Sequence, residues 1–253
     1  MSGAPPIARS ILGVSGLVLR RDWLKAQLRE RALTEFAAEL NTLCKSAEAL
    51  VAESREALVA WVAVLVEGGD SPWVNELRGL AHEANHHSLA RLMRSYSIAS
   101  GFDNTKTDDH NPALGHELSV GERRTLARAP HRGKIDRLLL DPNPLVLRQL
   151  LGNPKLTEND VISLAAQRPA RAATMKTLSE FPNWFVRSRV RMTIINNPLA
   201  PSSFAIPLTA LALRPQLVEI ADNPRLHVVL RAVALELLDR HPPLGPASSP
   251  ILQ

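Results

Sequence analysis

Residues 146–154 read VLRQLLGNP, and residues 190–198 read VRMTIINNP. The two segments align without a gap, and in both an apolar run that carries an arginine ends in Asn-Pro. Because proline lacks an N–H and clashes with the preceding helical turn, it ends one helix and opens the next. The pair therefore predicts short α-helices that recur along the chain and are separated by proline turns.

Proline is concentrated in the same half of the chain. Of the 19 prolines, 15 lie between residues 130 and 250, where they separate short apolar segments. The offset that relates the two Asn-Pro segments also places Ile162 and Leu164 on Ile206 and Leu208. Such self-similarity is typical of stacked helical units, because one helical pair cannot bury its apolar face alone.

By this punctuation, residues 132–240 resemble the leucine-rich-repeat-variant and HEAT-like α-solenoid families. Arg168-Pro169 and Arg214-Pro215 add a second recurring dipeptide to the Asn-Pro pairs. The resemblance implies a curved rod of short helices that binds a partner on its concave face. Some variant-repeat proteins also carry an iron–sulfur cluster on several cysteines. Cys44 is the single cysteine of this chain, so that feature does not carry over and no cofactor is expected.

The first half of the chain has the apolar spacing of longer helices. Six apolar residues follow one another in steps of three and four, which predicts one narrow buried face. They are Leu33, Phe36, Leu40, Leu43, Ala47 and Leu50. The helical pattern extends over residues 22–66, so a bend near 53–54 is expected. The sequence GGDSP at 68–72 predicts a stop, and a further helix is expected over 72–96, with Pro72 in its first turn.

These segments predict an all-α protein with two helical parts. Gly, Asp, Asn, Thr and Pro gather in residues 100–118 without apolar periodicity, which favours an exposed loop. Ser119 and Glu122 then have the spacing of a capping box at a helix start. The predicted organisation is an N-terminal helical domain over 1–99, a linker over 100–118, an α-solenoid domain over 119–241 and a flexible tail over 242–253.

Composition agrees with helices packed through aliphatic side chains. Hydrophobic residues make up 45% of the chain and aromatic residues only 4%, which disfavours a β-sandwich. One segment, 186–191, alternates as a half-buried strand would. Val186, Val190 and Ile194 also repeat every four residues, and the aligned segment 146–154 does not alternate, so a helix is the preferred interpretation.

The chain has the features of a cytoplasmic protein. With Cys44 alone, no disulfide within the chain can form, which fits a reducing compartment. The early apolar run at 11–19 stops at two arginines and lacks a small-residue cleavage site, so it does not indicate a signal peptide. No apolar stretch has the length of a membrane span, and membrane insertion is not expected.

The sequence HEANH at residues 82–86 matches the spacing of the zincin metalloproteases over these five positions. On a helix, His82 and His86 would share a zinc ion and Glu83 would act as general base. Third ligands would come from the downstream acids and histidine, Asp103, Asp108, Asp109 and His110. No zincin-like core precedes the motif, and eight histidines make one chance match unsurprising. A polar helix face without metal is therefore preferred, and a zinc hydrolase is kept as an alternative.

A basic stretch follows at residues 123–137. Its six cations are Arg123, Arg124, Arg128, Arg132, Lys134 and Arg137, against the single acid Asp136. The surplus equals the net charge of the whole chain, which is +5. Clustered arginine favours phosphate contact, so nucleic-acid association is one hypothesis. The interleaved aromatics of single-strand binders are absent, and a solvated pair of helix faces is the preferred interpretation.

The arginines of the repeat segments allow two interpretations. Arg187 and Arg191 lie one helical turn apart and would present a basic edge to an acidic partner. Arg148 and Arg231 recur with the repeat, which favours internal bonds to helix-end carbonyls or to acids such as Asp141 and Asp222. With no catalytic constellation, the preferred function is a non-enzymatic adaptor that binds a protein partner. Its expected contact residues are Arg123, Arg124, Arg128, Arg132, Arg187 and Arg191.

Overall fold

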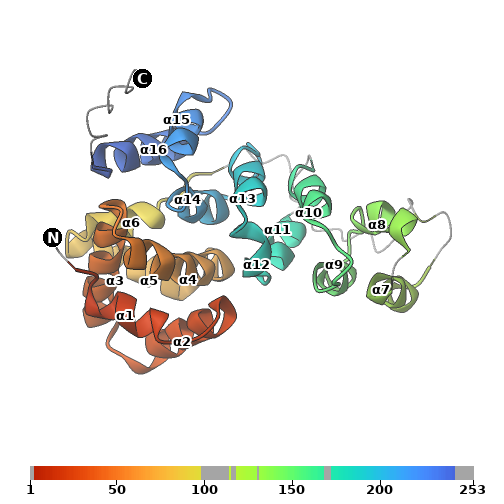
Figure 1. Ribbon diagram of the computed structural model, residues 1–253, viewed down its shortest axis with the longest axis horizontal. Coiled ribbons are helices and arrows are strands. Elements are labelled where there is room, and N and C mark those ends of the chain that lie inside the picture. Colours follow the sequence, from red (N-terminus) through yellow and green to blue (C-terminus); the bar gives the residue numbers. More distant parts are fainter. Residues whose placement is uncertain (1–2, 98–113, 115–117, 130, 168–171, 243–253) are drawn as a thin grey trace, which may run out of the picture.

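The computed structural model describes residues 3–97, 114, 118–129, 131–167 and 172–242. Over these residues the chain forms 16 α-helices and no β-strand (Figure 1). This confirms the predicted all-α class. The segment 186–191 lies in two helices, so its alternation does not mark a strand.

The N-terminal helices form one packed group. They are α1 (Pro6–Leu12), α2 (Leu17–Glu30), α3 (Leu33–Glu48), α4 (Ala52–Gly68), α5 (Pro72–Glu83) and α6 (His87–Leu92). The predicted seam lies on α3, where Phe36, Leu40, Leu43 and Ala47 are buried. α4 is apolar almost all round, and its residues 60–66 are all buried, so it forms the centre of this group.

Two breaks in this half differ from the sequence-based expectation. The bend expected near 53–54 lies at 49–51, because Leu50 has a φ of +61° and ends α3. The helix expected over 72–96 is two helices. Asn85 has a φ of +56°, and the N–H of His86 donates to the Ala81 carbonyl at 2.8 Å. This is a left-handed cap that terminates α5, and asparagine tolerates it better than most residues.

The second half consists of shorter helices. They are α7 (Val120–Arg128), α8 (Arg132–Leu138), α9 (Pro144–Leu151), α10 (Glu158–Ala165), α11 (Ala172–Ser179), α12 (Pro182–Phe185), α13 (Ser188–Ile195), α14 (Ser202–Thr209), α15 (Arg214–Asp222) and α16 (Val228–Arg240). The capping box of Ser119 and Glu122 is present at the start of α7. Prolines open α9, α12 and α15 as expected, whereas Pro207 lies inside α14, against the expectation that prolines only bracket helices.

The two Asn-Pro segments make the same contacts. The Asn153 amide donates to the carbonyls of residues 127 and 128 at the end of α7, at 3.0 and 2.6 Å. The Asn197 amide donates to the carbonyls of residues 165 and 167 at the end of α10, at 3.0 and 3.3 Å. In both, the side-chain oxygen accepts from the N–H two residues on. We call Asn153 and Asn197 the repeat asparagines. Each one satisfies carbonyls that a short helix leaves without a partner.

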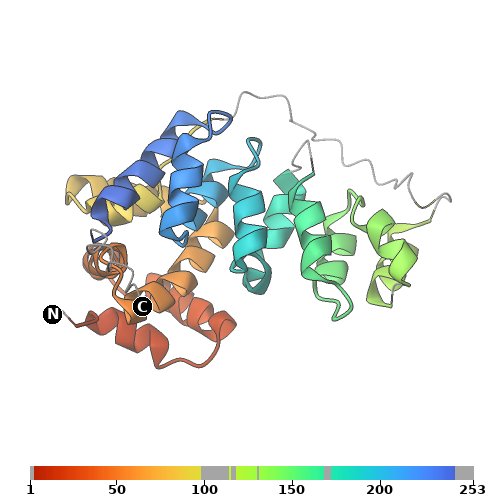
Figure 2. The same cartoon turned by 45° about the horizontal axis from the view of Figure 1, so that its top comes forward.

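The chain folds back so that its last helices cover its first ones. Helices α7 to α10 form a row that extends away from α1–α6, and α14–α16 return to them (Figures 1 and 2). α14 packs on α4, and α16 packs on α14 and α15. Arg91 of α6 joins buried Glu48 of α3 to Glu236 of α16, with an Nε–Oε2 distance of 2.9 Å to Glu236. Polar as well as apolar contacts therefore link the two ends of the chain.

None of the helices in the described ranges is long and apolar enough to cross a membrane.

Candidate functional site

The segment 82–86 does not have the geometry of a zinc motif. His82 and Glu83 lie in the last turn of α5, whereas His86 precedes the first turn of α6. The left-handed cap at Asn85 separates them, so the two imidazoles do not lie one turn apart on a helix. The expected third ligands, Asp103, Asp108, Asp109 and His110, lie outside the described residues. Within the described ranges, no three His, Cys, Asp or Glu side chains are grouped to hold a metal ion.

The cations of the basic stretch 123–137 are not all at the surface. Arg123 is only 2% exposed, and its Nε lies 2.9 Å from Oδ2 of buried Asp141. Arg132 is exposed but forms a two-pronged ion pair with Asp160. The expectation that Arg123 contacts a partner is therefore wrong, since its charge is neutralised inside the protein. Arg128 and Lys134 are exposed, and Arg124 is half-buried.

The repeat arginines are Arg148, Arg187, Arg191 and Arg231, and they also differ in their burial and in their partners. Arg191 is 7% exposed and donates to the Val186 carbonyl at 2.8 Å, so its expected role at a basic edge is wrong. Arg187 remains exposed and stacks on the Trp184 ring at 4.5 Å from the centroid. Arg231 donates to the Ala221 carbonyl at 2.8 Å, which confirms the expected helix-end contact.

Arg148 differs in its partner. It forms an ion pair with Glu180 and not with Asp141, which is bound to Arg123.

Cys44 is buried, and burial raises the pKa of its thiol well above the ordinary range, so it is not a reactive nucleophile.

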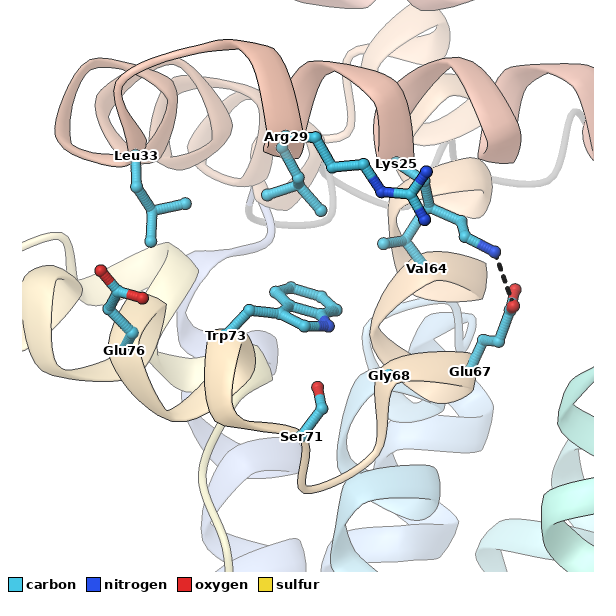
Figure 3. A pocket seen from close by; sticks show the side chains of 10 residues that line it. Lys25, Arg29, Leu33, Val64, Glu67, Gly68, Ser71, Trp73 and Glu76 are labelled. Atoms are coloured by element: carbon cyan, nitrogen blue, oxygen red, sulfur yellow. Dashed lines mark hydrogen bonds and ion pairs between the residues drawn. The ribbon is translucent and has the colours of Figure 1, made fainter.

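The structure brings together a different group of residues. A groove of about 510 Å³ lies between α2, α4, α5 and the start of α3 (Figure 3). Its apolar lining is formed by Leu28, Leu33, Val64 and Trp73. The volume is within the range of ligand pockets, which are commonly apolar with a few polar groups at defined positions. We call this surface the Trp73 groove.

Trp73 is fixed in the groove by its neighbours. Its ring centroid lies 6.4 Å from that of Trp61, which is fully buried in α4. Gly68 lies against the six-membered part of the ring, because an added Cβ there would be 2.4 Å from Cζ2 of Trp73. The glycine allows the indole to approach the end of α4, and the half-buried ring lines the centre of the groove (Figure 3).

Charged side chains stand at the rim. Arg21, Lys25 and Arg29 follow one another at four-residue spacing along α2, which places them on one helical face. Glu67 pairs with Lys25 at 2.7 Å and with Arg21 at 3.3 Å. Exposed Arg29 has no ion-pair or hydrogen-bond partner in the described part of the chain. Since Asp22 also pairs with Arg21 at 2.9 Å, the unpaired positive charge on the α2 side of the groove is that of Arg29.

The opposite side of the groove is polar in a different way. Glu76 of α5 is exposed, at the end of the groove near Leu33 (Figure 3). The Ser71 hydroxyl also lines the groove, and its Oγ is buried without a hydrogen-bond partner among the described residues. A buried hydroxyl without a partner costs free energy, so a bound segment that hydrogen-bonds to the Ser71 hydroxyl gains affinity from that contact.

Sequence reasoning missed this groove. Its residues come from four helices, and neither spacing nor a motif relates Arg29 to Trp73. The one local signal was Trp73 itself, a tryptophan directly after the Gly-Gly-Asp-Ser-Pro break. Comparison with known protein families, with curated proteins and with solved structures finds no match to this chain.

Proposed function

We propose that the protein is a non-catalytic adaptor that binds a segment of a partner protein in the Trp73 groove. The observation that carries this proposal is a half-buried tryptophan, held in place by Trp61 and Gly68, in a groove with an unpaired arginine at its rim. Tryptophan and arginine are the residues that most often dominate the binding energy of interfaces.

The charges of the rim define the partner segment. An apolar or aromatic side chain would occupy the space beside Trp73, and a carboxylate one or two residues away would meet Arg29 on α2. Glu76 lies at the other end and repels a carboxylate there, so the segment has one preferred direction. The partner is therefore a peptide segment with an acidic residue next to an apolar one.

The short helices of the second half serve this adaptor as a support. We infer that α7 to α13 are repeat units of an α-solenoid, because the repeat asparagines make the same bonds in two of them. Several arginines predicted as partner contacts take part in bonds within these units. We therefore assign partner binding to the groove and give the repeat arginines a structural role.

Selection from a random peptide library tests the proposal. Peptides enriched on the wild-type protein should carry an acidic residue close to a large apolar one. Their affinity, measured by fluorescence anisotropy, should fall at least tenfold in Trp73→Ala and in Arg29→Glu, since hot-spot truncation costs about 2 kcal/mol or more. Arg29 is exposed, so its variant should fold normally.

Arg189→Glu is the matched control, because Arg189 is an exposed arginine of α13, a helix that does not line the groove. It should leave peptide affinity unchanged. If the enriched peptides bind Trp73→Ala and Arg29→Glu as tightly as the wild type, the groove is not the binding site.

A further inference from the structure

Three arginines and a histidine gather at the junction between the two halves of the chain. Nη2 of Arg55, in the first turn of α4, donates to the carbonyls of residues 211–212 at 3.5 and 3.4 Å. Arg214 follows this turn and donates to the Pro242 carbonyl at 3.4 Å, next to His241. The first turns of α4 and α15 and the end of α16 therefore meet here.

Arg191 of α13 belongs to the same group. Its guanidinium is close enough to Arg55 for the two charges to repel each other. We call Arg55, Arg191, Arg214 and His241 the junction cluster.

Two members of the junction cluster are buried, and each has a side-chain nitrogen without a hydrogen-bond partner among the described residues. Arg191 and His241 are each 7% exposed. Nη1 of Arg191 bonds to a carbonyl, but its Nε has no hydrogen-bond partner in the described ranges, and neither has Nδ1 of His241. Buried polar atoms of a native protein nearly always have a partner, so these two atoms are available to hydrogen-bond a bound group.

The charges of the junction cluster are not balanced. No Asp or Glu within the described residues forms an ion pair with any of its four members. Desolvation, and then repulsion by Arg55, lowers the pKa of Arg191. Desolvation, followed by repulsion from Arg55 and Arg214, lowers the pKa of His241. Gathering like charges away from water is unfavourable unless an anion accompanies them.

From this arrangement we propose that the junction cluster binds a phosphate group. Phosphate offers several acceptor oxygens and up to two negative charges, which suits three guanidinium groups and an imidazole. The bound anion would lie beside Arg55, whose charge acts on both Arg191 and His241, and it would offset the repulsion within the junction cluster. The site shares no residue with the Trp73 groove, so phosphate binding and the adaptor function are tested independently of each other.

Thermal unfolding in phosphate tests this site. At about a hundredfold excess over the dissociation constant, inorganic phosphate should raise Tm by roughly 5–10 °C relative to chloride of equal ionic strength. Glycerol 3-phosphate is the second probe, since it distinguishes a site for the free ion from one that also accepts a phosphate ester. The rise should be lost in His241→Gln and Arg214→Gln, and Arg189→Gln should keep it, because Arg189 is an exposed arginine of α13 with no described partner.

A titration of His241 gives a second measurement on the wild-type protein. The pKa of its imidazole, followed by NMR and assigned by comparison with His241→Gln, should rise by about one unit or more in phosphate, because an adjacent anion favours the imidazolium. The proposal is overturned if neither probe stabilises the wild type beyond chloride, or if the variants retain the whole rise in Tm and the His241 midpoint does not move.

Discussion

Helices α4 and α9 satisfy their backbone N–H and C=O groups in different ways. α4 has 17 residues, so most of its backbone groups are bonded within the helix, and its apolar surface is covered on nearly all sides. α9 has only 8 residues, so about half of its N–H and C=O groups have no partner within the helix. Its neighbours compensate, because the Trp184 ring N–H donates to the Leu151 carbonyl at 2.9 Å. The first half of the chain is thus held together mainly by apolar packing, and the second half relies more heavily on polar side chains at helix ends.

The largest loss of stability is expected at the buried ion pair of the second half, between Arg123 and Asp141. Arg123→Met should reduce the free energy of unfolding by about 3–5 kcal/mol, because it leaves Asp141 charged and buried without its partner. Urea unfolding measures the loss, and Arg128→Met, at an exposed position of the same helix, should cost much less. In the double variant with Asp141→Leu, part of the loss should be recovered. An equal loss in Arg123→Met and Arg128→Met would contradict the burial of this pair.

Truncation of the apolar seam tests the first half. Leu40→Ala should cost about 2–5 kcal/mol, since Leu40 is fully buried on α3 and a cavity remains after truncation. Leu19→Ala is the control, because Leu19 is 59% exposed on α2. Urea unfolding should show little change for it. If the two leucine variants are equally stable, α3 does not pack as described.

The repeat asparagines should contribute less than either of these. Asn197→Ala removes the donor to two helix-end carbonyls and the acceptor for a loop N–H, which should cost about 1–3 kcal/mol. Asn183→Ala is the control, since Asn183 is exposed on α12 and makes no described side-chain bond. Hydrogen exchange should show the loss concentrated near α10 and α13. Loss spread evenly over α1–α6 would argue against a local role.

The smallest effect concerns acid stability. Desolvation opposes ionisation of Asp160, but hydrogen bonds from Arg132 and Thr157 outweigh it and hold its pKa at about 2, below the ordinary 3.8. A depressed pKa stabilises the fold above the unfolded value, so this stability should be lost as pH falls from about 4 to about 2. Arg132 is largely exposed, which limits the effect to about 1 kcal/mol. Asp160→Asn should flatten this part of the stability curve measured by urea unfolding, and an unchanged slope would contradict it.

Sequence-based prediction succeeded where the cause is local. The capping box of Ser119, the proline-opened helices and the seam on α3 depend on residues within a turn or two of each other. The end of α5 was also within reach, because Asn85 is a residue that tolerates a left-handed cap. It was missed because the stretch that starts at Pro72 was interpreted as one helix up to residue 96.

What depends on distant packing was not predictable in this way. Nothing near Arg123 in the sequence indicates burial, which follows from Asp141 being placed against it by the fold. Arg191 was likewise assigned to a surface, although the packing of α13 encloses it. The Trp73 groove combines α2, α3, α4 and α5, and its shape depends on how Gly68 receives the indole ring.

The return of α14 to α4 has a consequence for the order in which the protein matures during synthesis. The apolar surface of α4 leaves the ribosome early, but one of the helices that covers it, Ser202–Thr209, is made roughly 150 residues later. At about 5–20 residues per second, this surface waits for on the order of ten seconds or more without its cover. A nascent chain stalled before residue 202 should therefore bind a hydrophobic dye or a chaperone more strongly than the released protein. Equal binding would mean that the N-terminal helices close over α4 by themselves.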